Sequence, residues 1–115
     1  MVWPLDLLFT RKKAEMLSGK KAFKLSEEQI EIGRRKSEED NLEMVTLEPS
    51  GKRINIRETN FTSGISRTHA ILTWDSGRGK YRFKDVSRFG SMVNGIKVHK
   101  AEVVLENKAQ IELGE

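Results

Sequence analysis

The 115 residues suffice for one domain and leave no room for a catalytic domain plus a separate recognition domain. Apolar residues make up 37% of the chain and charged residues 33%, which excludes a disordered chain but predicts a lean core beneath a highly charged surface. The formal net charge of +4 favours anionic partners in general, and the absence of cysteine excludes disulfides and thiolate sites and suits a reducing intracellular compartment.

Short apolar clusters of strand length follow one another along the chain, with no long helical periodicity. The first cluster, Val2–Phe9, contains Pro4 and Asp6 and is too short for a membrane span or a secretory signal, so it is predicted as a strand with no membrane partner. The further predicted strands are Ala22–Leu25, Gln29–Gly33, Met44–Leu47, Arg53–Ile56, Ala70–Trp74, Tyr81–Asp85, Ser91–Asn94, Ile96–Val98, Val103–Leu105 and Gln110–Leu113.

Turn residues separate these clusters, and the Asn94-Gly95 pair is the strongest hairpin signal among them. About ten to eleven short strands at this spacing predict an all-β fold, an antiparallel β-sandwich with binding loops at one end. Two segments, Thr10–Met16 and Ser26–Glu31, are alternatively compatible with one or two turns of helix.

Most catalytic and metal-binding chemistry finds no support in the sequence. His69 and His99 stand on different predicted elements and form no metal-ligand pattern. Ser66, His69 and Asp85 offer the residue types of a catalytic triad, but no nucleophile-elbow pattern surrounds the serine. The sequence therefore predicts a protein that is not an enzyme and that has no metal or other cofactor.

Basic and hydroxyl residues are instead spread over three predicted turns. Gly33-Arg34 ends one strand, Ser66-Arg67-Thr68-His69 precedes another, and Ser87-Arg88-Phe89-Gly90-Ser91 lies in a turn before Val93-Asn94-Gly95. A phosphate monoester carries a charge of about −1.5 to −2 and three acceptor oxygens, so its receptor needs guanidinium groups and hydroxyl or backbone donors from several directions. Loops at one end of a β-sandwich can supply this arrangement.

At these residues the sequence resembles the forkhead-associated (FHA) domain, a phosphothreonine-binding β-sandwich. The family pattern is matched in order by Gly33-Arg34, Ser66-Arg67-Thr68-His69, Asp85-Val86-Ser87, Gly90-Ser91 and Val93-Asn94-Gly95. Ile111-Glu112-Leu113-Gly114 is similar to the penultimate strand of the family, whose last strand would follow. We therefore expect residues 1–115 to be a single FHA domain, with an FHA/SMAD-like sandwich, and the N-terminal fragment of a longer protein.

The resemblance also implies roles for single residues. Arg34 and Ser66 are expected to contact phosphate, with Arg67 beside them. The positions expected to shape the site rather than touch the ligand are Gly33, His69, Asp85, Gly90 and Gly95, the glycines because positive φ or close packing favours them.

The sequence departs from the family pattern at two positions of the last turn. Phe89 stands where the family commonly has an asparagine that holds the peptide backbone after the phosphothreonine, so the grip on the peptide is expected to differ. Arg88 brings a charged side chain, and our hypothesis is that it joins the phosphate cluster; the alternative is an exposed turn arginine. Asn94 is expected to serve either the peptide or its own hairpin.

A narrower resemblance, carried by Trp3 and Arg88-Phe89-Gly90, is to the branch of the family found in nibrin, a subunit of the DNA double-strand-break repair complex. It implies a nuclear protein that recruits this complex to phosphorylated partners. The partners implied are a phosphothreonine-containing protein and other subunits of a nuclease–ATPase DNA repair complex.

Two other functions remain open at this point. The basic stretch Arg11–Lys24 and the basic hairpin Arg78–Lys84, with Trp74, Tyr81 and Phe83 nearby, are compatible with direct nucleic-acid binding. Strand alternation places Tyr81 and Phe83 on the face opposite the charges, which favours a core position for both. The third alternative is an interaction domain that has lost phosphate recognition, which Phe89 keeps open.

Overall fold

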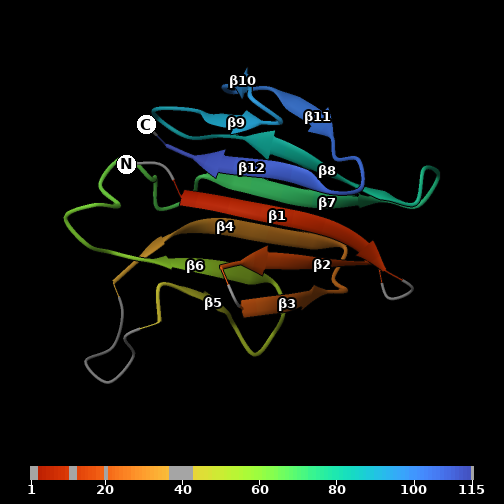
Figure 1. Cartoon of the computed structure of the whole chain (residues 1–115), viewed down its shortest axis with the longest axis horizontal. Coiled ribbons are helices and arrows are strands. Elements are labelled where there is room, and N and C mark those ends of the chain that lie inside the picture. The colour runs from red at the N-terminus through yellow and green to blue at the C-terminus, as the bar shows by residue number, and fades with distance from the viewer. Residues whose placement is uncertain (1–2, 11–12, 20, 37–42, 115) are drawn as a thin grey trace.

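The computed structural model describes residues 3–10, 13–19, 21–36 and 43–114, which form a sandwich of two six-stranded sheets (Figure 1). The first sheet has the strand order β10-β9-β12-β1-β2-β3, and the second has the order β11-β8-β7-β4-β6-β5. The twelve strands are β1 (Trp3–Thr10), β2 (Lys13–Ser18), β3 (Lys21–Leu25), β4 (Gln29–Arg35), β5 (Val45–Leu47), β6 (Arg53–Arg57), β7 (Ala70–Asp75), β8 (Lys80–Asp85), β9 (Ser91–Val93), β10 (Ile96–Val98), β11 (Glu102–Val104) and β12 (Ala109–Leu113). The predicted all-β sandwich is confirmed.

Both segments for which helical turns were an alternative contain strand instead. Lys13–Ser18 forms β2, one strand more than the sequence predicted, and pairs with β1 and β3. Ala14 and Met16 are fully buried on this strand, a spacing of two residues that suits a sheet. Ile30 and Ile32 repeat the spacing on β4. One pair, β4 with β6, runs parallel, whereas the other pairs of the two sheets are antiparallel.

The core lies between the two sheets and is built from alternate residues of the strands. Tyr81 and Phe83 are fully buried within it, and the ring of Trp74 meets that of Tyr81 edge-on at 4.9 Å between centroids. The aromatic residues of the basic hairpin therefore pack inward and form no platform for stacking bases, which counts against the nucleic-acid alternative. The other fully buried large side chains are Leu5, Leu7, Met16, Leu25, Ile30, Ile32, Ile54, Ile56, Ile65 and Leu72.

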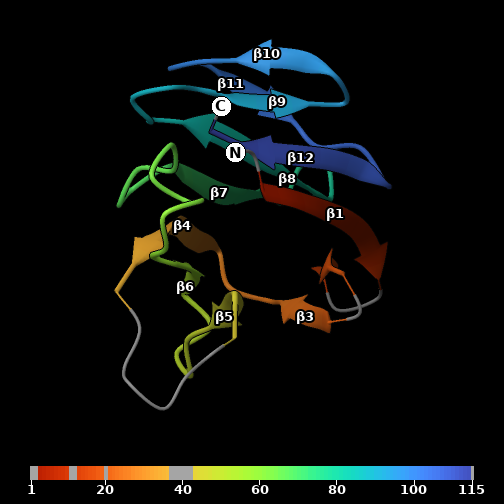
Figure 2. The same cartoon turned by 60° about the vertical axis from the view of Figure 1, so that its left-hand side comes forward.

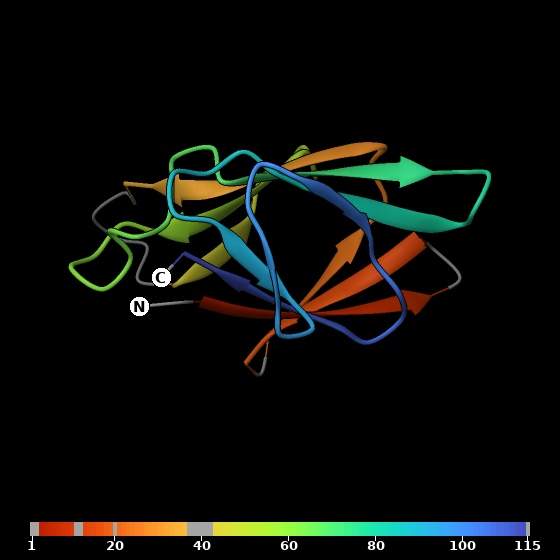
Figure 3. The ribbon, with the colours of Figure 1, turned by 90° about the horizontal axis from the view of Figure 1, so that it is seen from above.

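Three segments that carry the predicted site lie at one end of the sandwich, on the left in Figures 1 and 3. They are the end of β4, the connection from β6 to β7 and the connection from β8 to β9. With this end turned forward, Figure 2 shows the β8–β9 connection above the β6–β7 connection and the end of β4 below both. Among the described residues, no helix has the length and apolar character needed to cross a membrane.

Candidate functional site

The three predicted turns meet at Ser66. The Arg34 N–H, at the end of β4, donates a hydrogen bond to the Ser66 carbonyl at 2.9 Å. The Arg88 N–H, in the β8–β9 connection, donates to Ser66 Oγ at 3.0 Å. Segments far apart in the sequence are thus joined by direct hydrogen bonds within one small region.

Gly33 allows the backbone of Arg67 to cross β4 beside Arg34. A Cβ atom at position 33 would lie 1.8 Å from the Arg67 carbonyl oxygen, which excludes every other residue unless the backbone moves. Arg53 Nη2, from the neighbouring strand β6, donates to the same carbonyl at 2.7 Å. The position of Arg67 next to Arg34 therefore depends on a glycine and on an arginine of another strand.

A hollow of about 520 Å³ opens beside these residues and is strongly positive. Arg34 and Arg67, both predicted site residues, lie in its wall, whereas Ser66 and Arg88 do not. Glu58 is the acid among the described residues that line it. The full lining is Arg34, Arg35, Lys36, Arg53, Glu58, Arg67 and Thr68.

Arg34 is already paired within the chain. Its Nη1 donates to Glu58 Oε1 at 2.9 Å, with the two side chains 22% and 33% exposed. Arg34 Nε is buried and has no hydrogen-bond partner in the described part of the chain. The guanidinium has five N–H donors, so its pairing with one carboxylate oxygen leaves much of its capacity unused.

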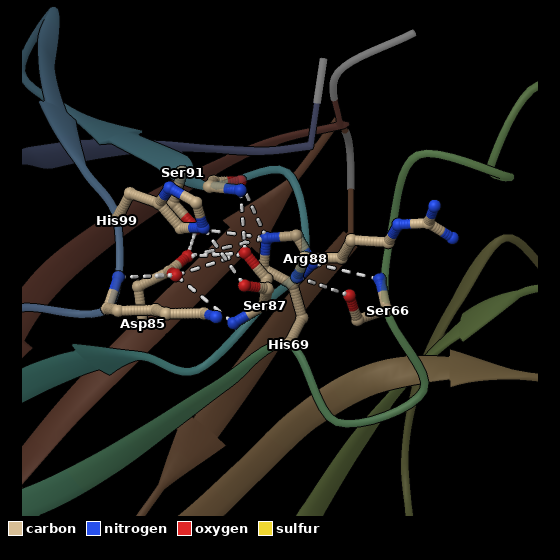
Figure 4. A network of polar contacts seen from close by, with 9 residues as sticks. Ser66, His69, Asp85, Ser87, Arg88, Ser91 and His99 are labelled. Atoms are coloured by element: carbon tan, nitrogen blue, oxygen red, sulfur yellow. Dashed lines mark hydrogen bonds and ion pairs between the residues drawn. The ribbon is translucent and has the colours of Figure 1, made fainter.

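The hydroxyl of Ser66 is held in place from the β8–β9 connection. Because Ser66 Oγ accepts the hydrogen bond from the Arg88 N–H, its own proton can be donated to an anion. The Arg88 side chain is exposed, reaches outward past Ser66 (Figure 4), and its guanidinium carbon lies 5.2 Å from the centre of the Phe89 ring. Arg88 therefore contacts Ser66 through its backbone, while its side chain contacts half-buried Phe89.

His69 is fully buried between the two connections (Figure 4). The Ser66 N–H donates to His69 Nδ1 at 3.0 Å, so that nitrogen carries no proton. His69 Nε2 therefore carries the proton and lies 2.9 Å from the Gly90 carbonyl oxygen, to which it donates. Burial lowers the pKa of His69, and this outweighs the opposing effects of the Gly90 carbonyl and the Asp85 carboxylate. A neutral imidazole thus connects Ser66 to the opposite turn.

The Asp85 side chain holds the β8–β9 connection in place through hydrogen bonds. Its fully buried carboxylate accepts hydrogen bonds from the Ser87 N–H and hydroxyl, from the Ser91 hydroxyl at 2.5 Å and from the Lys100 N–H at 3.0 Å. Burial by itself raises the pKa of Asp85, but the hydrogen bonds from Lys100, Ser91 and Ser87 together outweigh it and lower the pKa. The side chain therefore remains a carboxylate that fixes the turn carrying Arg88.

Asn94 lies apart from this cluster, in the hairpin beyond the far end of β9. It has a positive φ of 52°, and its Oδ1 accepts a hydrogen bond from the Gln110 N–H at 2.9 Å. Gly95 follows in the same turn with φ 78°. The contacts that the structure shows for Asn94 join its hairpin to β12 through Gln110.

Sequence reasoning did not single out Arg53 and Glu58 as parts of this site. Arg53 is the first residue of strand β6 and Glu58 follows its last, and the parallel pairing of β6 with β4 places Ile56 opposite Arg34 and Arg57 opposite Arg35. His99 was also missed as part of the scaffold: its Nε2 lies 3.1 Å from the Ser87 carbonyl oxygen. No local motif marks these residues, because their positions depend on pairing between distant segments.

The state of His69 predicts a stability that decreases in mild acid. Because the pKa is lowered from its ordinary 6.5 in the folded chain, the unfolded chain binds this proton first as the pH falls. The unfolding free energy is therefore highest above a pH of about 6.5 and falls below it, by at most about 1.4 kcal/mol per pH unit. Urea unfolding between about pH 7.5 and about pH 5.5 measures this loss.

Two variants separate the histidines in that experiment. His69→Gln removes the buried titrating group and should flatten the profile, whereas His99→Gln should retain the slope. A profile of His69→Gln as steep as that of the wild type would assign the acid sensitivity to another group.

A comparison with known protein families agrees with the motif pattern. The family described as FHA domain matches residues 30–114, which is most of the chain. A solved structure titled "Engineered FHA with Myc-pTBD peptide" is similar over 100% of this chain and 92% of its own length, with a TM-score of 0.45 and 12% sequence identity. A search of curated proteins finds no match. The chain belongs to the FHA domain family, whose members are phosphopeptide-recognition modules rather than enzymes.

Proposed function

We propose that this domain binds proteins that carry a phosphothreonine, with the phosphate at the junction of Arg34, Ser66 and Arg67. The observation that carries the proposal is the convergence of the three turns on Ser66, beside a hollow with five cationic side chains. A fixed hydroxyl next to guanidinium groups matches the oxygens and charge of a phosphate monoester. Arg88 is our fourth phosphate contact, because its N–H donates to Ser66 Oγ and its side chain is exposed beside Ser66 (Figure 4).

The expected affinity is micromolar. Charge-assisted hydrogen bonds contribute about 1.5–3 kcal/mol each, so Arg34, either Arg67 or Arg88, and the Ser66 hydroxyl together supply about 4.5–9 kcal/mol before the cost of association is subtracted. A dissociation constant of about 1 μM corresponds to about 8 kcal/mol, so contacts to flanking peptide residues must supply the rest. Phe89 is the residue we assign to that contact, through its half-buried ring rather than through hydrogen bonds.

Titration calorimetry with one peptide in phosphothreonine, phosphoserine and unphosphorylated forms tests the function. Ser66→Ala should weaken phosphothreonine binding by about tenfold, because one charge-assisted hydrogen bond is worth at least about 1.4 kcal/mol. Ser63→Ala removes an exposed hydroxyl of the same connection and is the matched control. Equal binding of the phosphorylated and unphosphorylated peptides would contradict the proposal.

Titrations with other ligands distinguish the alternatives. Strong binding of bare DNA with a steep salt dependence, and no binding of any phosphopeptide, would favour the nucleic-acid function. Binding of a partner protein that is insensitive to phosphatase treatment would favour an interaction domain without phosphate recognition.

We further propose that the domain recruits a DNA double-strand-break repair complex to phosphorylated partners in the nucleus. The support is the Arg88-Phe89-Gly90 turn, which resembles the nibrin branch, together with Trp3; Met1 and Val2, which precede it, lie outside the described residues. A fluorescent fusion of the domain should accumulate at DNA breaks, and Ser66→Ala should abolish the accumulation. Accumulation that persists in this variant, or no accumulation at all, would contradict this role.

A further inference from the structure

Glu58 occupies a position where a phosphate-binding domain would be expected to avoid negative charge. It is the first residue after β6, and its N–H donates to the Arg35 carbonyl at 3.0 Å, which fixes its backbone beside the end of β4. Its carboxylate oxygen Oε1 accepts a hydrogen bond from Arg34 Nη1 at 2.9 Å. The other charged residues that line the hollow are all cationic.

The ion pair places an intramolecular anion on the arginine that is expected to bind the ligand. Both side chains are partly shielded from solvent, at 22% and 33% exposure, so the attraction between them is stronger than in an exposed pair. The pair is nevertheless incomplete, because Arg34 Nε is buried without a partner in the described chain. An anion with more charge and more oxygens can therefore accept hydrogen bonds from more of the Arg34 N–H donors than Glu58 does.

We propose that Glu58 is an internal competitor for Arg34, displaced by phosphate, that sets an affinity threshold which a phosphate dianion exceeds and a peptide carboxylate does not. The inference rests on the proposed phosphothreonine function and names a specificity-determining residue for it. Glu58 contacts no ligand in the bound state; it acts through Arg34.

Charge and tethering together explain the threshold. A glutamate or aspartate on a peptide brings one negative charge and two oxygens, the same as Glu58, but Glu58 is held next to Arg34 at an effective concentration in the millimolar range or above, about a thousandfold higher than a micromolar peptide. Phosphate brings a charge of about −1.5 to −2 and three acceptor oxygens, so it can displace the tethered carboxylate. Displacing Glu58 costs every anion the same free energy, so both affinities fall by the same factor and the weaker carboxylate drops below the useful range.

The variant that tests this is Glu58→Gln, which keeps the size of the side chain and an oxygen acceptor but removes the charge. Its matched control is Glu102→Gln, which removes the same charge from an ion pair on the same sheet, between Glu102 and Arg82, neither of which lines the hollow. Each protein is titrated with one peptide carrying phosphothreonine, glutamate or threonine at the same position. Thermal unfolding of each variant checks that it is folded.

The expected result is that Glu58→Gln binds the phosphothreonine peptide about three- to tenfold more tightly than the wild type, as removal of a partly shielded ion pair allows. The glutamate peptide should gain by a similar factor, because both anions displace the same competitor. Glu102→Gln should behave like the wild type. In an Arg34→Ala background the effect of Glu58→Gln should vanish, since the two residues act as a pair.

Two results would overturn the proposal, and they differ from each other. If the wild type binds phosphothreonine and Glu58→Gln binds it equally or more weakly, Glu58 positions Arg34 rather than competing for it, and the phosphothreonine function stands. If neither protein distinguishes phosphothreonine from threonine, the phosphothreonine function itself is wrong and the inference falls with it.

Discussion

Replacing Asp85 by alanine is expected to lower the free energy of unfolding by about 3–5 kcal/mol, the largest effect of any single substitution considered for this chain. The fully buried carboxylate accepts hydrogen bonds from Ser87, Ser91 and Lys100, and these donors lose their partner when it is removed. Each buried donor left unsatisfied costs about 1–3 kcal/mol. Lys100 adds to the loss, because its φ of 52° is held by the hydrogen bond to Asp85.

Urea unfolding at neutral pH measures this loss, and Glu106→Ala provides the comparison. Glu106 forms an ion pair with Lys80, but its side chain is 64% exposed, so its removal should cost less than about 1 kcal/mol. A cost for Asp85→Ala as small as that for Glu106→Ala would show that the network around Asp85 contributes little to the fold.

The sheets follow from local sequence more completely than the site does. Alternation of buried and exposed residues predicted most strands, because a strand with one face on the core repeats every two residues. Strand β2 was not among the predicted strands, and Ala14, Glu15 and Met16 in it are also good helix formers. Its pairing with both β1 and β3 decides in favour of a strand, and that pairing is a tertiary effect which local propensity does not contain.

Some residues of the site could be predicted from local sequence motifs, whereas others depend on pairing between distant segments. Arg34, Ser66 and His69 could be found because each belongs to a short run of residues with a recognisable pattern. Arg53 and Glu58 could not, because the parallel pairing of β4 with β6 brings them to the hollow. Parallel neighbours need a crossover between distant segments, and no turn signal fixes their register.

Gly33 could be predicted from the sequence, but the reason for a glycine at this position is visible only in the structure. The sequence identified it as a position that shapes the site, on the strength of its place before Arg34. The reason is a contact with another segment: the Arg67 carbonyl would lie 1.8 Å from a Cβ at position 33. The requirement for glycine thus comes from the crossing of two backbones and not from a turn of its own.

Arg34→Ala is expected to weaken phosphothreonine binding by about tenfold to about a hundredfold, the largest effect on affinity among the binding residues. Arg34 has only 22% of its side chain exposed and lies beside Ser66. A phosphate bound to it is therefore partly shielded from solvent, which strengthens the attraction between the two charges. The fold should persist, because the hydrogen bond to Ser66 comes from the Arg34 backbone and the released Glu58 is already one-third exposed.

Two controls show whether charge alone explains the loss. Arg78→Ala removes one positive charge from the β7–β8 turn, at the end of the sandwich opposite the site (Figure 1), and should leave the affinity within about twofold of the wild type because salt screens charges at this distance. Arg34→Lys keeps the charge but loses the planar fork that matches phosphate oxygens, so it should recover only part of the affinity. Calorimetric titration of all three variants with the phosphothreonine peptide gives the comparison. Equal affinity of Arg34→Ala and the wild type would place the phosphate elsewhere on the domain.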